Sequence, residues 1–285
     1  PDGFAAAWLG RRVGTLVVCT IHGGDVNVYP HRTKFTRVVT QQAIRSVDVL
    51  ITVSAESKER TLALETPKQD IRVIPNGVDL QQFAPRDKDL SRSELGLPQD
   101  KRIIVYASRL AKAKGLSFLL AAFKTVLERE NDCLLILVGD GHYRQPLAQE
   151  VAEMGLQDDV VFTGYRPHAE VAKWMNAGDL VVLPSLTEGS PLPVYEALAC
   201  GKPMVASRVG GIPEIITSDD YGLLVPPANS EALTGALLHG LRKEWNPQQI
   251  REYSTRYSWA NVANQLADLY GELLNGRAQV LSSQG

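Results

Sequence analysis

From residue 101 onward the chain repeats one pattern: a short apolar run, a loop with glycine or proline, and an amphipathic helical segment. The apolar runs are RIIVYAS (102–108), CLLILVG (133–139), VVFTG (160–164), LVVLPS (180–185), PMVAS (203–207) and GLLV (222–225). Each run is apolar throughout, which is typical of strands that are buried on both faces of a parallel sheet. The alternation of such strands with helices predicts a doubly wound α/β domain over residues 101–255.

The first part of the chain shows the same pattern in a shorter form. Its predicted strands are TLVVCTI (15–21), DVLITV (48–53) and IRVIP (71–75). Three strands are few for an independent doubly wound domain, and the chain does not begin with Met, so we expect residues 1–84 to be part of a larger domain. Residues 85–100 are polar and rich in turn-forming residues, which predicts an interdomain linker.

The composition argues against several classes of function. The chain has 285 residues, of which 44% are hydrophobic and 22% are charged, and its formal net charge is -2. This balance, with no dense basic run, argues against nucleic-acid binding, and no apolar run approaches the roughly 18 residues that span a bilayer. The cysteines Cys19, Cys133 and Cys200 neither pair by spacing nor lie near histidines in a metal-binding pattern. We therefore expect free thiols and a cytoplasmic location.

The segment LPSLTEGSPLPVYEALACG holds two glutamates, with Glu188 before a predicted helix and Glu196 about one turn inside it. In an open parallel sheet, ligands bind beyond the carboxyl ends of the strands, where the start of a helix offers unpaired N–H groups to a phosphate. Gly189 and Ser190 allow a ligand to approach the backbone closely. Two carboxylates would repel phosphate, so we expect them to face the hydroxyl groups of a sugar and a ribose. The alternative is an ordinary strand-turn-helix unit whose glutamates are solvated.

A second loop, SRLAKAKG (108–115), follows the first strand of the same domain and carries Arg109 and Lys114. Both loops leave the carboxyl edge of one sheet, so they are predicted to converge. A guanidinium and an ammonium group there would complement a diphosphate, and oriented charges of this kind can stabilise a leaving group by about 3 kcal/mol. The alternative is a solvated basic turn.

Three further features are candidates for the same chemistry. GYRP (164–167) ends another strand and could hold Tyr165 and Arg166 against a nucleotide base, whereas the GDG turn at 139–141 is either a ligand loop or a site of tight packing. His22 follows the strand TLVVCTI and precedes two glycines, which is a suitable position for a polar catalytic group. The remaining histidines lie in loops or polar helical positions without metal-binding spacing: His31, His142, His168 and His239.

Taken together, these motifs resemble the retaining glycosyltransferases of family four, whose GT-B fold has two Rossmann-like doubly wound domains. In sequence order the motifs are HGGD, VSAES, IPNGVDLQQF, SRLAKAKG, LVGDGH, VVFTGY, LPSLTEGSPLPVYEALACGKPMVAS, VGGIPEI and GLLVPP. They cover nearly the whole chain, and EGSPLPVYE is similar to the two-glutamate signature of the family. The resemblance implies that the N-terminal domain is incomplete and that a helix within residues 256–285 crosses back to it, followed by a tail.

The resemblance also implies a role for each matching residue. Arg109 and Lys114 match the pair that holds the donor diphosphate, and Glu188 matches the glutamate near the donor sugar. Glu196 matches the glutamate that binds the ribose, and His22 matches the acceptor-side histidine that contacts the transferred sugar. The expected backbone contacts to the sugar and phosphate are at Gly189, Ser190, Pro191 and Leu192. Serine and proline at positions 190 and 191 replace a bulkier aromatic residue and a glycine that are common in the family, so we expect a different pocket shape.

The activity implied by the resemblance is a metal-independent hexosyl transfer that uses no cofactor and retains the anomeric configuration. The donor is a nucleoside-diphosphate sugar, and the acceptor is a saccharide or a lipid-linked molecule in cell-envelope or exopolysaccharide synthesis. A lipid-linked acceptor would bring peripheral membrane contact. We expect this chain to bind the donor but to show weak or no transfer. Two alternatives remain: a non-catalytic sugar-nucleotide-binding protein, and a sugar-nucleotide epimerase, for which the chain offers few additional acid–base residues.

Overall fold

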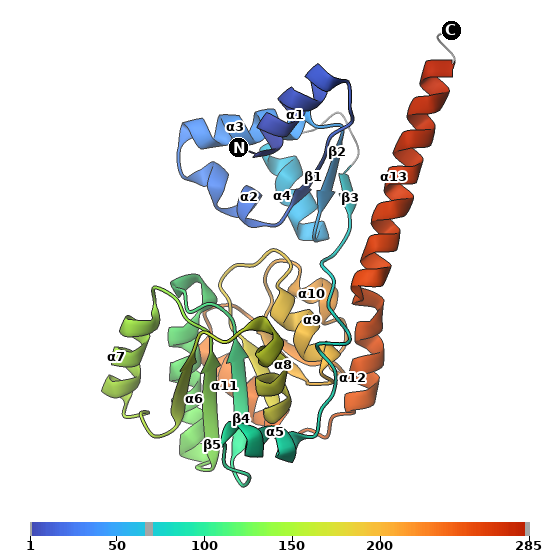
Figure 1. Ribbon diagram of the computed structural model, residues 1–285. Coiled ribbons are helices and arrows are strands. Elements are labelled where there is room, and N and C mark those ends of the chain that lie inside the picture. Colours follow the sequence, from blue (N-terminus) through green and yellow to red (C-terminus); the bar gives the residue numbers. More distant parts are fainter. Residues whose placement is uncertain (1, 66–70, 283–285) are drawn as a thin grey trace. The chain divides into compact units, whose positions relative to one another are not determined.

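The computed structural model describes residues 2–65 and 71–282 as a mixed α/β protein (Figure 1). The chain divides into two compact units. The first comprises Pro1–Val78 and Arg256–Gly285, and the second comprises Asp79–Thr255. Each unit holds one parallel sheet, which confirms the α/β fold class predicted from the sequence.

The sheet of the second unit has six parallel strands in the order β6-β5-β4-β7-β8-β9. The strands are β4 (Arg102–Ala107), β5 (Cys133–Val138), β6 (Val160–Gly164), β7 (Leu180–Leu183), β8 (Met204–Ser207) and β9 (Gly222–Val225). They coincide with the six apolar runs of the sequence. The chain moves outward from β4 to β6 and then returns to form β7 on the other side of β4. The carboxyl ends of β4 and β7 therefore flank the topological switch point, which is where open α/β sheets bind ligands.

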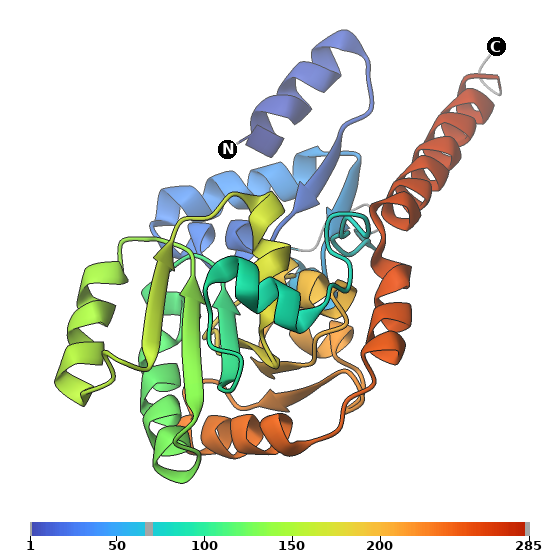
Figure 2. The same cartoon turned by 60° about the horizontal axis from the view of Figure 1, so that its bottom comes forward.

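Helices cover both faces of this sheet (Figures 1 and 2). They are α5 (Lys88–Leu95), α6 (Leu116–Arg129), α7 (Arg144–Met154), α8 (His168–Ala177), α9 (Leu192–Ala199), α10 (Ile212–Ile215), α11 (Ser230–Arg242) and α12 (Pro247–Ser254), with the short 3-10 turn η2 (Lys112–Lys114). Helix α6 packs on α7 and α11, whereas α8 packs on α5 and α9. The central strand β4 is covered on both sides, because the side chains of Ile103, Ile104 and Val105 are fully buried.

The segment 85–100, which was predicted to be a linker, instead forms α5 within the second unit. Two of its turn-forming residues are helix caps. Asp87 accepts a backbone hydrogen bond in the first turn, and Gly96 ends the helix in the left-handed conformation. The buried Arg92 donates to the carboxylate of Asp179 at 2.7 Å and so ties the helix to the loop before β7. Part of the segment that was predicted to be a linker is therefore a packed helix.

The first unit has a three-stranded parallel sheet in the order β1-β2-β3. Its strands are β1 (Val18–Ile21), β2 (Val49–Thr52) and β3 (Ile71–Val73), one in each predicted run. Its helices are α1 (Asp2–Val13), α2 (Gly24–Asn27), α3 (Lys34–Ser46), α4 (Ala55–Leu64) and α13 (Trp259–Ser282). Two 3-10 turns, η1 (Tyr29–His31) and η3 (Thr255–Tyr257), precede α3 and α13.

The two faces of this smaller sheet pack into separate clusters, because successive side chains of a strand point to opposite faces. Leu50 packs in a cluster with Ile44 of α3. Its neighbour Ile51 packs in a second cluster with Val262 and Leu269 of α13. Helix α13 is thus part of the core of the first unit. Neither α13 nor any other helix among the described residues is long and apolar enough to cross a membrane.

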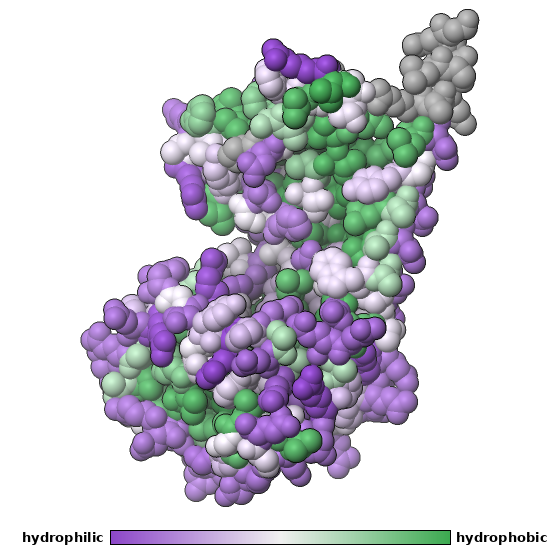
Figure 3. Space-filling view, in the orientation of Figure 1, coloured by the Kyte–Doolittle hydropathy of each residue, from purple (hydrophilic) through white to green (hydrophobic). Residues whose placement is uncertain are grey.

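Hydrophobic side chains gather on the visible face of the first unit (Figure 3). Strand β1 pairs with β2, and no other strand among the described residues pairs with it. Beside β1 runs a groove that is lined by Thr15, Leu16, Val18, Tyr270, Leu273 and Leu274. This unit therefore exposes apolar surface along the open edge of its sheet.

Candidate functional site

Two loops converge beyond the carboxyl ends of β4 and β7, at the switch point of the second unit. The loop after β4 carries Arg109 and Lys114, and the loop after β7 carries Glu188. A hydrogen bond joins the loops directly, because the backbone N–H of Leu186 donates to the carbonyl group of Ala113 at 2.8 Å. The two loops that the sequence predicted to converge therefore lie side by side.

Two glycines allow the backbones in this region to approach closely. Gly115 has a φ of +67°, and a Cβ atom at this position would lie 2.0 Å from the carbonyl oxygen of Pro184. Gly210 has a φ of +56°, and its Cβ would lie 2.4 Å from the carbonyl oxygen of Glu188. No side chain fits at either position without moving backbone. The loop after β7 is thus held between two glycine turns, which fixes the position of Glu188.

The GDG turn after β5 supports the loop after β4. A Cβ atom on Gly139 would lie 2.2 Å from the carbonyl oxygen of Ser108, and one on Gly141 would lie 2.2 Å from that of Leu110. The structure therefore agrees with tight packing, which was one of the two interpretations of this turn. The GDG turn thus affects the site indirectly, because it packs against the segment that carries Arg109.

The side chains of Lys114 and Glu188 form an ion pair across the two loops. Nζ of Lys114 lies 2.5 Å from Oε1 of Glu188, and the hydroxyl group of Ser185 donates to the same oxygen at 2.6 Å. The exposed fractions of the Lys114 and Glu188 side chains are only 15% and 9%. This contact contradicts the alternative of a solvated basic turn at Lys114 and that of a solvated carboxylate at Glu188. Arg109 from the same loop is exposed.

Glu196 is buried in α9, with 7% of its side chain exposed. Its Oε1 lies 2.6 Å from Nε2 of His168, the first residue of α8. The hydrogen bond to Glu196 raises the pKa of His168 above its ordinary value, although burial acts in the opposite direction. Sequence reasoning placed His168 only among polar positions. No spacing connects residues 168 and 196, so the signal that was missing is the packing of α8 on α9.

A cavity of about 450 Å³ opens beside these groups. Its lining includes the side chains of Arg109, Tyr165, Arg166, His168 and Glu196. The ring of Tyr165 is largely exposed. The guanidinium group of Arg166 lies 5.5 Å from the centre of the Trp174 ring, and its buried Nε has no hydrogen-bond partner among the described residues. The cavity thus combines an exposed aromatic ring, two guanidinium groups and a buried carboxylate.

The segment Gly189 to Leu192 leads from the Glu188 loop into α9. Pro191 occupies the N-cap position without a side-chain hydrogen bond to the first turn. The hydroxyl group of Ser190 is buried, 2.5 Å from that of Tyr195, and so is directed into the protein. Pro191 and Pro193 have no N–H group, and the N–H of Val194 donates to the carbonyl group of Pro191, so Leu192 supplies the N–H group at the start of α9 that no side chain caps.

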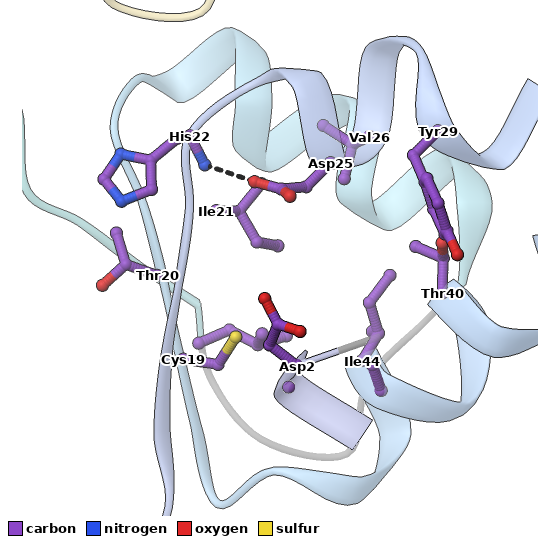
Figure 4. A pocket seen from close by; sticks show the side chains of 13 residues that line it. Asp2, Cys19, Thr20, Ile21, His22, Asp25, Val26, Tyr29, Thr40 and Ile44 are labelled. Carbon is purple, nitrogen blue, oxygen red and sulfur yellow. Dashed lines mark hydrogen bonds between the residues drawn. The ribbon is translucent and has the colours of Figure 1, made fainter. Parts of the chain in front are cut away.

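His22 lies in the first unit, at the end of β1, whereas the other predicted site residues lie in the second unit. Its backbone N–H donates to the carboxylate of Asp25 at 2.9 Å. A cavity of about 250 Å³ adjoins this turn, and Figure 4 shows that the imidazole points away from its centre. The side chains of Asp2 and Cys19 point into it (Figure 4). The turn after β1 therefore fixes the backbone of His22 and leaves its imidazole exposed.

Among the residues that the structure describes, the other candidates for metal or thiol chemistry do not gather into a site. Among the described residues, no group of three or more His, Cys, Asp or Glu side chains is arranged to hold a metal ion. The three cysteines are free. Burial raises the pKa of Cys133 to about 11 and that of Cys200 to about 12, so both remain protonated thiols at neutral pH.

The glycine packing predicts a difference between two Gly→Ala variants. Gly115→Ala is expected to reduce the free energy of unfolding of the second unit by about 2–5 kcal/mol, because a methyl group would overlap the Pro184 carbonyl in addition to the left-handed strain. Gly155→Ala is the control, since its φ is +73° but no atom lies within 4 Å of the added Cβ. It should cost only about 1–2 kcal/mol. Urea denaturation followed by circular dichroism measures both, and equal losses would contradict the close approach.

The contact between Glu196 and His168 predicts a titration effect. Glu196→Gln is expected to lower the pKa of His168, because it removes the carboxylate that raises this pKa. In the native protein the charged pair contributes its full stability below the unfolded pKa of about 6.5, and this contribution is lost as the pH rises through the higher folded pKa. It should stay below about 1 kcal/mol, because the imidazole is more than half exposed. An NMR titration of the imidazole Hε1 signal should show the shift, and identical pKa values in the two proteins would refute the contact.

Comparison with known protein families gives two matches in sequence order. Residues 1–82 match the profile described as Glycosyltransferase Family 4. Residues 87–257, which are more than half of the chain, match the profile described as Glycosyl transferases group 1. The two matched regions are separated by only a few residues.

Curated relatives agree with these matches. The putative teichuronic acid biosynthesis glycosyltransferase TuaC of Bacillus subtilis is 33% identical over 87% of this chain and 61% of its own length. A D-inositol 3-phosphate glycosyltransferase of Corynebacterium urealyticum is 33% identical over 83% of this chain and 59% of its own length. The chain thus spans about three fifths of the length of these relatives.

Solved structures agree with the fold. Sucrose-phosphate synthase from Thermosynechococcus elongatus superposes with a TM-score of 0.83 and 27% identity, covering 96% of this chain and 72% of that one. Anabaena HepE in complex with UDP and glucose superposes with a TM-score of 0.80 and 25% identity, covering 94% and 75%. With the family match over residues 87–257, these findings confirm the resemblance seen in the sequence: the chain belongs to the Glycosyl transferases group 1 family and has the GT-B fold.

Proposed function

We propose that the second unit binds a nucleoside-diphosphate sugar in the cavity beside β4 and β7. In the whole protein, the hexosyl group of this donor is transferred with retention of configuration to a saccharide or lipid-linked acceptor, in cell-envelope or exopolysaccharide synthesis. The observation that carries this proposal is the convergence of Arg109, Lys114, Glu188 and Glu196 at the switch point of one sheet. The family membership supports the reaction class.

The diphosphate is assigned to the two cations and the start of α9. Lys114 carries three N–H donors, of which one contacts Glu188, so further donors are free to meet phosphate oxygens. Arg109 is exposed at the cavity wall and can approach the same group as a planar donor. The backbone N–H groups of Gly189, Ser190 and Leu192 are proposed to face the phosphate as well, and the start of α9 adds a partial positive charge. No metal ion and no cofactor is needed in this arrangement.

The two carboxylates are assigned to hydroxyl groups rather than to phosphate. Glu188 has its Oε1 held by Lys114 and Ser185, next to the proposed diphosphate, where the hexose would lie. Glu196 lines the cavity together with Tyr165 and Arg166, which suits a ribose flanked by a base. HepE, whose structure holds UDP and glucose, makes uridine the first base to test.

Transfer also requires an acceptor side, to which we assign His22 of the first unit. Its exposed imidazole is proposed to contact the transferred sugar. Retention would result from attack on the same face of the sugar, with the departing diphosphate taking the proton of the acceptor hydroxyl group. A protein that binds the donor without transferring it is the second candidate, because every proposed contact with the nucleotide lies in the second unit.

Calorimetric titration with UDP, GDP and ADP, and then with the matching nucleotide sugars, tests the proposed donor site. Arg109→Ala and Lys114→Ala are each expected to weaken nucleotide binding about ten- to hundredfold, since a hydrogen bond to a charged group contributes about 1.5–3 kcal/mol. The matched control is Lys112→Ala, an exposed lysine of the same loop, which should bind like the native chain. No binding by a folded native chain, or equal losses in all three variants, would overturn the proposal.

A second test separates the sugar from the nucleotide. In Glu188→Gln, the ammonium of Lys114 loses its carboxylate partner and the site loses a negative charge near the diphosphate. UDP is therefore expected to bind at least as tightly as in the native chain, while donor hydrolysis or transfer falls by about tenfold or more. Collapse of UDP affinity in this variant would show that Glu188 does not serve the sugar.

A further inference from the structure

We infer that Gln82 and His168 form a positioning relay that holds the carboxylate of Glu196 in the orientation needed to bind the ribose of the nucleotide. The relay joins the segment before α5, the start of α8 and the buried face of α9, all within the second unit. The inference rests on the proposed function, because it takes a nucleotide as the ligand of the cavity.

Heavy-atom distances fix the proton positions in this relay. Nε2 of Gln82 lies 3.2 Å from the backbone carbonyl oxygen of His168 and 3.0 Å from Nδ1 of its ring. A carbonyl oxygen only accepts hydrogen bonds, so the amide must present its NH₂ group on this side. Nδ1 then has to accept as well, which leaves the proton of a neutral imidazole on Nε2. That N–H is directed to Oε1 of Glu196 at 2.6 Å.

The capping of α8 does not account for the orientation of the His168 imidazole. His168 is the first residue of α8, but the helix has no side-chain cap, and the imidazole makes its contacts with residues far along the chain. The ring is also held by the buried Phe83, whose ring centre lies 5.0 Å away at an interplanar angle of 55°. The ring is thus held by Gln82, Phe83 and Glu196, and it forms part of the cavity wall.

As a consequence of this relay, Oε1 of Glu196 accepts a hydrogen bond from the imidazole, whereas Oε2 is available to a ligand. A buried carboxylate needs hydrogen bonds, and the imidazole supplies one to Oε1 of Glu196. No hydrogen bond from the described residues occupies Oε2, and Glu196 lines the cavity. Two neighbouring ribose hydroxyl groups require an acceptor of fixed orientation, which a carboxylate free to rotate would not provide.

Two charged groups act on the imidazole, namely Glu196 from α9 and Asp79 from the turn before Gln82. Both favour the imidazolium, whereas the NH₂ group of Gln82 favours the neutral ring. Protonation therefore keeps the contact with Glu196 but requires the amide of Gln82 to rotate. The relay is complete only when His168 is neutral.

The binding test compares UDP with 2′,3′-dideoxy-UDP by calorimetry at pH 8. The native chain is expected to prefer UDP by about tenfold or more, because a charged acceptor binds the hydroxyl groups. His168→Ala should reduce this preference to nearly the level of Glu196→Ala, and the double variant should lose nothing further. His168→Gln, which keeps an N–H donor, should recover most of the preference. Glu170→Ala, an exposed change on α8, is the matched control and should behave like the native chain.

The possible outcomes separate the relay from the donor site. If the native chain binds UDP and His168→Ala keeps the full preference over the dideoxy analogue, the relay is wrong and the proposed function stands. If the folded native chain binds no nucleotide, the proposed function fails and the ribose role fails with it. Circular dichroism melts check that each variant is folded.

An NMR measurement tests the relay without any ligand. In the ¹⁵N-histidine-labelled chain at pH 8, His168 is expected to carry its proton on Nε2, as the distances to Gln82 require. In Gln82→Ala the Nδ1–H form should gain population, and the preference for UDP should fall in part. A native chain with the proton on Nδ1 would overturn the inference even if UDP binds.

Discussion

The candidate site depends on the close approach of backbone segments at the switch point of the second sheet. Gly115 and Gly139 place their Cα atoms where any Cβ would overlap a neighbouring carbonyl oxygen. Loops joined in this way have little freedom to shift relative to one another, since an interior packed to this density does not deform continuously. The side chains that they carry are therefore positioned by the sheet. Arg109 and Glu188 belong to loops from two strands, yet they share one framework.

Much of this framework could be predicted from the sequence. The six apolar runs gave the strands of the second unit, because strands buried on both faces leave a strong local signal. The positions of Arg109, Glu188 and Glu196 beyond strand ends followed from the same pattern. The segment 85–100 was predicted to be a linker because it is polar and rich in turn-forming residues, but two of these residues, Asp87 and Gly96, cap the helix α5. Only the packing of Arg92 distinguishes the two cases.

The contacts between side chains could not be predicted in this way. Lys114 and Glu188 are far apart in sequence, and so are His168 and Glu196, and no local pattern reports which partners meet. Gln82 was hidden for a further reason, since it lies in a turn-rich segment that sequence reasoning treated as a connection between domains. Each of these pairs forms where two elements lie side by side. Which elements become neighbours depends on the order of the strands in the whole sheet.

These contacts also explain how two glutamates can stand in a site proposed for a diphosphate. Glu188 is neutralised by Lys114 at 2.5 Å, and Glu196 is held by His168 at 2.6 Å. The cavity wall also carries the guanidinium groups of Arg109 and Arg166 and the carboxylate of Asp140, and the start of α9 adds its dipole. An anion at the switch point would therefore be attracted by the cations of Arg109 and Lys114, while Oε2 of Glu196 remains available to an uncharged hydroxyl group. From the sequence alone, Glu188 and Glu196 would be expected to repel a phosphate group. In the structure Glu188 pairs with Lys114 and Glu196 with His168, so the two glutamates are compatible with phosphate binding.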